Sequence, residues 1–172
     1  MLGFLTMAPE EDSEGRPGAA DRLLSATAHA LEARGLRLAG AVQDNLDRGE
    51  GRACDMDLRI LGDGAVIRIS QDLGNCAESC RLDAGAFAQA VGRAEAALAR
   101  GADLVIVNKF GKQECHGRGF REFIAQALAR GVPVLLAVPA GQWAAFHEFA
   151  GDLAQPVARD ALIDWALAQT AA

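Results

Sequence analysis

The sequence predicts an α/β domain whose mostly parallel sheet carries helices on both faces. Short apolar runs alternate along the chain with longer segments of helical spacing, which is the pattern of strand–helix units. The runs are almost continuously apolar, as expected for strands buried on both faces. No repeat or linker interrupts the 172 residues, so we expect one domain over residues 1–172.

The first element that we expect is a strand over residues 2–7, followed by an acidic loop rich in Gly and Pro over residues 8–19. A helix then begins with Asp21 as its N-cap and ends at Gly35. Its apolar residues recur at helical spacing and share one face. A second strand over residues 36–42 follows this helix.

A polar loop is predicted over residues 43–54, and two strands over 56–61 and 65–70 then form a hairpin around a Gly-Asp-Gly turn. Residues 71–81 are predicted to form a further loop. The next helix has Asp83 as its cap and runs to about residue 100, where a glycine ends it. The hairpin is therefore an insertion between strand–helix units.

The second half of the chain continues the alternation. The apolar run 104–107 predicts a strand, and residues 118–130 predict the helix after it. A strand over 134–138 ends at a proline, and two helices over 142–149 and 160–171 complete the chain. In a parallel sheet of this kind, ligands bind at the carboxyl ends of the strands.

Composition excludes several classes of partner. The net charge is −6, and no basic block or basic–aromatic stripe is present, so we expect neither nucleic acid nor an anionic membrane surface as a partner. The N-terminal apolar run is shorter than the roughly 7–15 residues of a signal-peptide core. No apolar stretch approaches the roughly 18 residues of a membrane span. We therefore expect a cytoplasmic protein with reduced cysteines.

The strand over 104–107 ends in an amide and a cation, Asn108 and Lys109, and Lys112 follows. Gln43 marks the end of the second strand. These four residues are candidates for binding an oxyanion such as molybdate or phosphate, because amides donate hydrogen bonds and lysines supply charge. The alternative is that the lysines are ordinary surface charges paired with a neighbouring glutamate.

Two further stretches supply candidate ligand-binding residues. Arg118 lies between two glycines that are predicted to open a helix, whose N–H groups and guanidinium would both suit an anion. Ser70 and Gln71 follow a strand and would present a hydroxyl and an amide. The alternatives are a turn that leaves Arg118 in solvent, and local side-chain-to-backbone hydrogen bonds at Ser70.

Four cysteines form a weaker candidate for a metal site. Cys54 and Cys80 are the pair that we single out as metal ligands, because thiolates bind zinc and soft metals. The spacing contains no C-x-x-C pair, and the alternative is that all four are small buried thiols.

Several stretches resemble known families. HALEARGLRLAGAVQ and DLVIVNKFGKQE resemble P-loop nucleoside triphosphatases related to a thermophile enzyme. A closer resemblance is to a bacterial family known as domain of unknown function 2478, and it implies a P-loop NTPase-like topology and a link to molybdate handling. It rests on CDMDL (54–58), IRISQDLG (67–74), CRLD (80–83), VNKFGKQE (107–114) and GRG (117–119).

The chain departs from the hydrolase pattern at both of its charged positions. Ala20 stands where a phosphate loop has its lysine, and Asp21 stands where it has its hydroxyl. Asn108 and Lys109 replace the two acids that would manage magnesium and water. Because phosphoryl transfer relies on these groups, magnesium is not expected as a cofactor.

We therefore expect a small-oxyanion or nucleotide-binding protein that does not hydrolyse its ligand and is linked to molybdate handling. The cofactor is left open, with molybdate or another oxyanion as the candidates. One alternative is a weak nucleoside triphosphatase. The other is a protein-interaction module, or a homodimer, in which Trp143 and its helix would face a partner if they were exposed.

Overall fold

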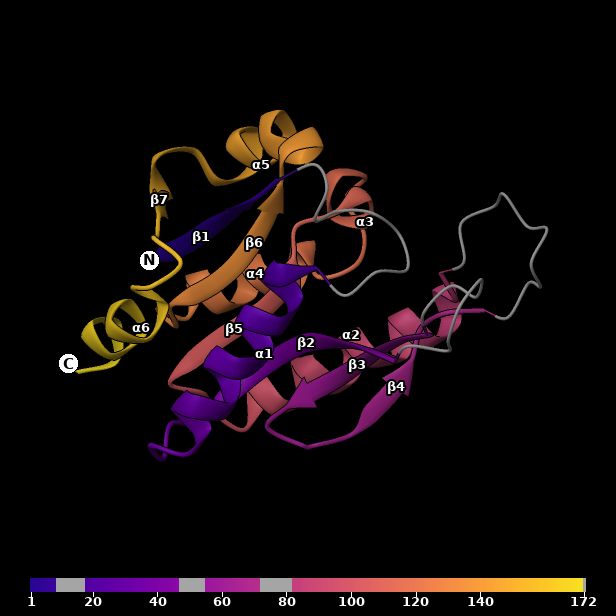
Figure 1. Ribbon diagram of the computed structural model, residues 1–172, viewed down its shortest axis with the longest axis horizontal. Helices are drawn as coiled ribbons and strands as arrows, with labels where there is room; N and C mark the ends of the chain where they lie inside the picture. The colour runs from indigo at the N-terminus through magenta and orange to yellow at the C-terminus, as the bar shows by residue number, and fades with distance from the viewer. Residues whose placement is uncertain (9–17, 47–54, 72–81, 172) are drawn as a thin grey trace.

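The protein is described by a computed structural model that covers residues 1–8, 18–46, 55–71 and 82–171. The described chain contains a seven-stranded sheet with the order β4-β3-β2-β5-β6-β1-β7 (Figure 1). Five strands are parallel, and β3 and β4 run antiparallel as an added hairpin. The strands are β1 (Leu2–Met7), β2 (Leu38–Leu46), β3 (Asp55–Leu61), β4 (Val66–Arg68), β5 (Leu104–Lys109), β6 (Val134–Pro139) and β7 (Ala154–Pro156).

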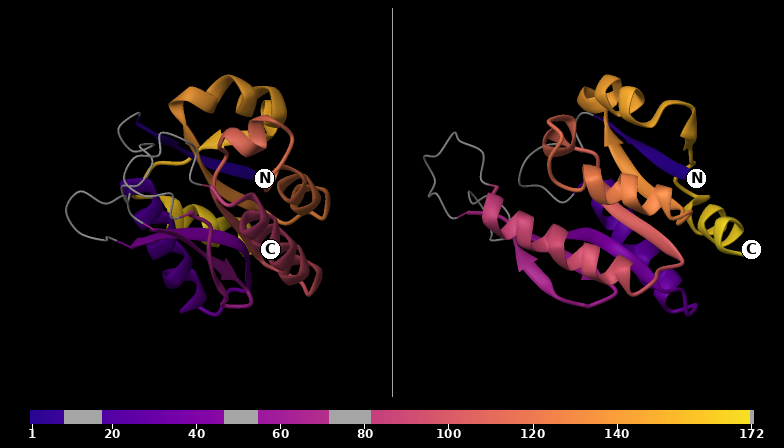
Figure 2. Two further views of the ribbon diagram at one scale, coloured as in Figure 1. Left: turned by 90° about the vertical axis from the view of Figure 1, so that its right-hand side faces the viewer. Right: turned by 180° about the vertical axis from the view of Figure 1, so that it is seen from behind.

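Helices cover both faces of the sheet, which confirms the predicted fold class (Figure 2). One face carries α1 and α6, and the opposite face carries α2, α4 and α5, each packed on the central strands or on its neighbour. The helices are α1 (Ala19–Glu32), α2 (Ala84–Ala99), α3 (Lys112–Cys115), α4 (Arg121–Ala129), α5 (Trp143–Ala150) and α6 (Leu162–Thr170).

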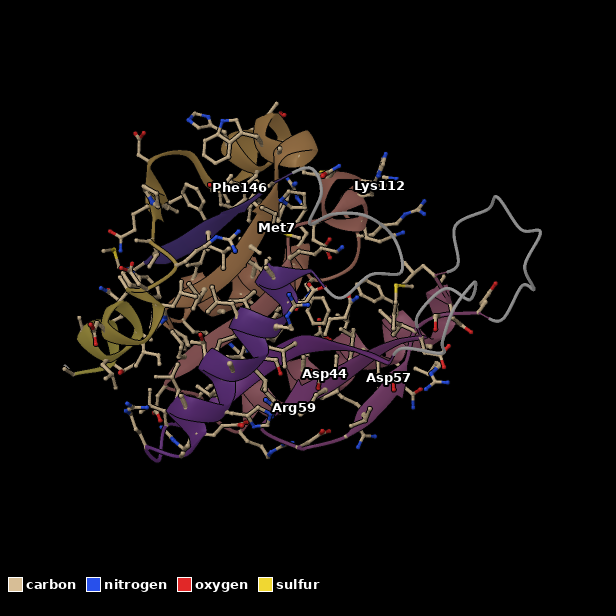
Figure 3. All side chains as sticks on the ribbon, viewed as in Figure 1. Met7, Asp44, Asp57, Arg59, Lys112 and Phe146 are labelled. Atoms are coloured by element: carbon tan, nitrogen blue, oxygen red, sulfur yellow. The ribbon has the colours of Figure 1, made fainter. Side chains whose placement is uncertain are left out.

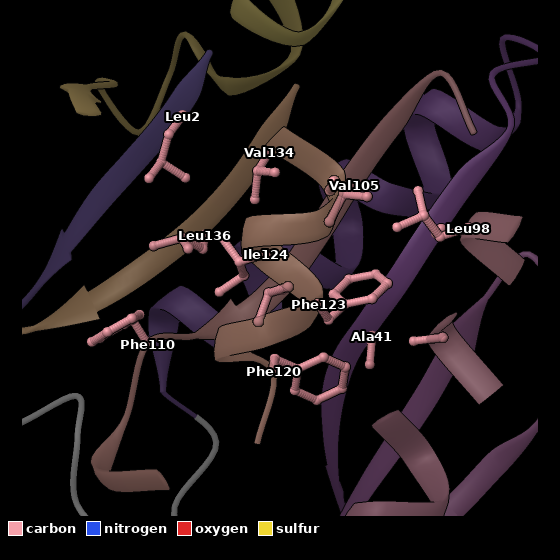
Figure 4. Packing of buried hydrophobic residues seen from close by; sticks show 14 of the residues in the cluster. Leu2, Ala41, Leu98, Val105, Phe110, Phe120, Phe123, Ile124, Val134 and Leu136 are labelled. Atoms are coloured by element: carbon pink, nitrogen blue, oxygen red, sulfur yellow. The ribbon is translucent and has the colours of Figure 1, made fainter. Parts of the chain in front are cut away.

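Two apolar cores lie on the two faces because neighbouring residues of a strand point to opposite sides. In β5, Leu104 and Ile106 belong to the core beneath α1, whereas Val105 and Val107 belong to the core beneath α2 and α4. Figure 4 shows the second core, where the aromatic rings of α4 lie against the sheet. This alternation decides which face each polar residue at a strand end can reach.

The second strand is longer than predicted. We expected a polar loop from residue 43, but residues 43–46 continue β2. They do so because the whole of β3 pairs antiparallel with β2, with Gln43 opposite Leu58. Gly40 permits β5, which lies on the other side of β2, to approach closely. Its φ is +111°, and a Cβ there would lie 2.0 Å from the Ile106 carbonyl oxygen of β5. β2 is therefore paired on both sides, with β3 along one edge and with β5 along the other.

Two helix boundaries also differ from the prediction. Gly18 is the N-cap of α1, so Asp21 lies inside the first turn and not at the cap. The predicted helix over 118–130 is shorter, because α4 begins at Arg121 and a separate short helix, α3, precedes it. Gly117 and Gly119 have φ values of +74° and +60°, which a right-handed helix cannot contain.

Among the helices of the described residues, none combines the length and the apolar character that crossing a bilayer requires.

Candidate functional site

The predicted site lies at the carboxyl end of β5, where a bulge changes the direction of the side chains. Val107 pairs with Leu136 of β6 and Lys109 with Ala137, so Asn108 is the extra residue between them. Asn108 keeps the α1 face that Leu104 and Ile106 occupy. The bulge then turns Phe110 into the opposite core, where it packs against the aromatic rings of α5.

Asn108 joins three elements through its side-chain amide. Its Nδ2 donates to Asp21 Oδ1 at 2.8 Å, and its Oδ1 accepts from the backbone N–H of Gln43 at 2.9 Å. The second carboxylate oxygen of Asp21 accepts from the backbone N–H of Gly18 at 3.3 Å. Asn108, Asp21 and Gln43 are all buried. We call this chain of contacts the Asn108 bridge, and it connects the start of α1 to β2 and β5.

The Asn108 bridge lies at the N-terminus of α1, where the resemblance to P-loop hydrolases would place the phosphates. The N-terminus of a helix attracts anions because its first N–H groups are unpaired. At α1 the protein's own Asp21 carboxylate takes that place. Ala20 is completely buried and uncharged, so its position offers no cation to a phosphate. The part of the predicted phosphate loop before Gly18 falls in residues 9–17, outside the described residues.

The segment between β5 and α4, residues 110–120, folds around a second buried carboxylate, Glu114. Its Oε2 accepts from the backbone N–H of Gly111 at 2.9 Å, and its Oε1 accepts from that of Phe120 at 2.8 Å. Burial raises the pKa of Glu114, although both hydrogen bonds and the nearby Lys109 oppose the rise. We call residues 110–120 the Glu114 loop.

Gly119 is required for this arrangement. Its φ is +60°, and a Cβ there would lie 2.2 Å from Glu114 Oε1 and 2.9 Å from a ring carbon of Phe87. A side chain at this position would push the carboxylate away from the Phe120 N–H. The glycine therefore lets the loop close around Glu114.

The predicted cations lie on or next to the Glu114 loop. Lys109 is half-buried, and it lies near enough to lower the pKa of Glu114. Lys112 and Arg118 are exposed, and Figure 3 shows Lys112 projecting from α3, apart from Asp44 of β2 and Asp57 of β3. Arg118 lines a pocket against α2, on the opposite face from the Asn108 amide. The structure therefore does not gather all predicted ligands in one place.

The hydroxyl of Ser70 has a structural partner. It is buried, and its Oγ accepts from the backbone N–H of Met56 at 3.1 Å, which ties the end of the hairpin to β3. Gln71 is exposed. This contact is a side-chain-to-backbone bond, but Met56 lies 14 positions earlier in the chain, so it is not the local bond of the alternative interpretation.

The two cysteines that we proposed as metal ligands, Cys54 and Cys80, lie outside the described residues. Cys115 is half-buried, and burial and the nearby Glu114 raise the pKa of its thiol, which lowers its reactivity. Within the described ranges, no three His, Cys, Asp or Glu side chains are grouped as ligands for a metal ion.

A cluster of acidic residues near the end of the hairpin was missed by sequence reasoning. Asp44 Oδ1 accepts from Ser25 Oγ at 2.9 Å, so it contacts the middle of α1. Asp57 and Asp55 both pair with Arg68, at 2.7 Å and 2.6 Å. Alternating acids in β3 and a basic residue in β4 were the available signal. Their pairing makes them part of the hairpin's structure.

Comparison with known proteins now identifies the family. The model of the DUF2478 family, described as "Protein of unknown function", matches residues 13–165, so the chain belongs to this family. The predicted family is thereby confirmed.

One curated relative is a molybdenum import ATP-binding protein, ModC 2, of Bradyrhizobium diazoefficiens. It is 41% identical over 133 residues, which is 77% of this chain and 15% of the relative. The chain therefore spans only a small part of that protein's length. No solved structure matches the chain. An ATP-binding relative agrees with the predicted relation to P-loop proteins, and the sheet described above is consistent with a P-loop NTPase-like topology.

Proposed function

We propose that this chain binds a small oxyanion or a nucleotide without hydrolysing it, and that it does so in connection with molybdenum import. The Asn108 bridge supports the absence of hydrolysis. Phosphoryl transfer needs a cation at the phosphate loop and acids that position magnesium and water. Here Asp21 fills the helix N-terminus, and the amide of Asn108 is used in holding it there.

Positive charge is instead concentrated beyond the strand tip. Residues 109–121 contain four Lys or Arg residues and one acidic residue, Glu114, which is buried, in a chain of net charge −6. Lys112 is exposed, and its ammonium makes no ion pair or hydrogen bond with the described residues. An incoming oxyanion would therefore meet Lys109 and Lys112, with the Glu114 loop fixing their backbone.

The connection with molybdenum rests on the curated relative. Its printed name assigns it to molybdenum import, and the matched segment is 15% of its length. Segments of one polypeptide act at the same place and time. We infer that this chain serves the same process, and molybdate is accordingly the first oxyanion to test.

Calorimetric titration with molybdate, tungstate, phosphate and ATP tests the binding. We expect heat with at least one of them, and about a tenfold weaker affinity when Lys109→Gln and Lys112→Gln are combined, since each lost charge contact removes roughly 0.7 kcal/mol. Arg34→Gln removes one positive charge beyond the far end of α1 and should leave the affinity unchanged. No heat with any of the four ligands would overturn the proposal.

Phosphate release from ATP or GTP with magnesium tests the absence of hydrolysis. We expect no release above the blank, because Asp21 already has two hydrogen-bond partners inside the protein. Release that disappears in Asp21→Ala would favour the alternative of a weak nucleoside triphosphatase.

The interaction alternative is supported by one observation on α5. Trp143 packs against Phe4 in a tilted arrangement with ring centroids 5.2 Å apart, yet 43% of its surface is exposed. An exposed tryptophan suits a protein interface. Light scattering tests this alternative: a dimer that Trp143→Ala dissociates would favour it, and a monomer would exclude a homodimer.

A further inference from the structure

A pocket of about 320 Å³ lies on the α2 face of the sheet, between α2 and the Glu114 loop. Its volume is at the lower end of the range for small-molecule sites. Phe87 and Val91 of α2 line one side, and Gln113, Arg118 and Gly119 line the other. Asp21 and Asn108 belong to the α1 face, so this pocket is separate from the strand tip.

The walls of the pocket are apolar and held in place. Phe87 packs edge-on against Phe120 with ring centroids 5.5 Å apart, and Phe120 is buried in the core. Gly119 brings the loop close to the Phe87 ring. A flat or branched hydrocarbon group would therefore meet an ordered surface, which lowers the entropic cost of binding.

The loop side of the pocket is polar. Arg118 is exposed, and neither its guanidinium nor the side-chain amide of Gln113 makes a hydrogen bond or ion pair with the described residues. A guanidinium binds carboxylates, phosphates and sulfonates through two parallel hydrogen bonds. Glu95 of α2 also lines the pocket and disfavours a second negative charge on the ligand.

We propose that this pocket binds a small organic anion, with its apolar or aromatic body against Phe87 and Val91 and its single oxyanion group on Arg118. A bare inorganic oxyanion would leave the apolar wall unused. This goes beyond the proposed oxyanion site, because it uses neither Lys109 nor Lys112.

The test uses 8-anilinonaphthalene-1-sulfonate, an aromatic sulfonate whose fluorescence rises in apolar surroundings, and its uncharged relative N-phenyl-1-naphthylamine. We expect the folded protein to bind one molecule of the sulfonate per chain. Arg118→Gln should weaken the sulfonate about tenfold and leave the uncharged probe unchanged. Arg34→Gln, which removes a distant charge, should change neither.

A second variant fills the pocket. A Cβ at Gly92 would meet no atom within 4 Å, so a side chain can leave the helix there, and Gly92→Phe also replaces a poor helix former. It should abolish the binding of both probes. Gln89→Phe adds the same ring to an exposed position of α2 outside the pocket lining and should leave binding unchanged. Circular dichroism and urea unfolding confirm that the variants are folded.

Sulfonate fluorescence that is absent, or that neither variant reduces, would overturn the proposal. A wild-type dimer that Gly92→Phe dissociates would also overturn it, since a second copy would then cover the pocket. The molybdate titration on Gly92→Phe separates the two sites: unchanged heat shows that the oxyanion site is intact whatever happens to the probes.

Discussion

Asp21 and Glu114 are two buried carboxylates that use the same local device with different results. Each lies in the first turn of its helix and accepts the backbone N–H of the residue before that helix. The second oxygen of Asp21 accepts from the side chain of Asn108, 87 positions away, whereas that of Glu114 accepts from Phe120, six positions away. The first carboxylate joins distant elements, and the second closes one loop.

The difference explains which side of the β5 tip can offer charge to a ligand. At α1 the carboxylate is buried and bonded to Asn108 and to the Gly18 backbone. At the Glu114 loop the carboxylate is inside, and Lys112 and Arg118 lie outside. An internal acid can therefore either replace a bound anion or support the residues that would bind one.

Asn108→Asp should break the Asn108 bridge and produce the largest loss of stability. It removes the side-chain N–H donor of the bridge and places two buried carboxylates against each other. We therefore expect a loss of about 3 kcal/mol or more in the free energy of unfolding. Urea unfolding at neutral pH measures this loss.

The exchanged pair is the control for this prediction. In the double variant Asp21→Asn with Asn108→Asp, the new amide can donate to the new carboxylate, and both backbone N–H groups keep an acceptor. Most of the lost stability should return. If the double variant is as unstable as Asn108→Asp alone, the bridge is not the source of the effect.

Gly119→Ala should disturb the Glu114 loop and cause a smaller loss of stability. The positive φ and the contact with Glu114 Oε1 together should cost about 2 kcal/mol. Gly117→Ala is a matched control, because its φ is also positive but a Cβ there would meet nothing within 4 Å. Equal losses in thermal or urea unfolding for the two variants would mean that only backbone strain was measured.

The stability that Glu114 provides should depend on pH. Burial raises its folded-state pKa, so its contribution is complete below its ordinary pKa of about 4.5 and declines as pH rises through the raised value. Glu114→Gln does not titrate. The stability advantage of the wild type over this variant should therefore shrink from acidic to neutral pH, as followed by urea unfolding. A constant or growing difference would contradict the prediction.

Lys112→Gln should have the smallest effect on stability, within about 0.5 kcal/mol, because the side chain is exposed. Its effect should be seen in anion affinity, which should also weaken with added salt in the wild type more than in the variant. Titrations at low and high ionic strength measure both. An affinity that is independent of salt would show that the anion does not bind through exposed charge.

Much of the fold could be predicted because its signals are local. Apolar runs located β1, β2, β5 and β6, whereas the three-residue β7 was not predicted. Asp83 was identified as the cap of α2, where its carboxylate accepts from Ala86. The length of β2 depends on its pairing with β3, which a pattern of single residues does not contain. Gly117 and Gly119 were placed at a helix start, since sequence alone does not give the sign of φ.

The candidate site was predicted less completely than the fold. The strand tip at Asn108 was located from its neighbours in sequence, but its partner Asp21 is brought to it only by the packing of α1 on the sheet. The β-bulge decides that Asn108 faces α1 and Phe110 faces the other core. Arg118 was predicted as an anion ligand at the start of a helix, and its position in the pocket beside α2 follows from the closure of the Glu114 loop.

The two edges of the sheet limit how this protein can associate with others. Both edge strands, β4 and β7, are three residues long, and β7 ends in Pro156, which has no N–H to offer. Short edges interrupted by proline are poor templates for adding a strand from another chain. We therefore expect assembly to proceed through side chains on the helical faces and loops. These side chains can be substituted one at a time without disrupting the pairing of the strands.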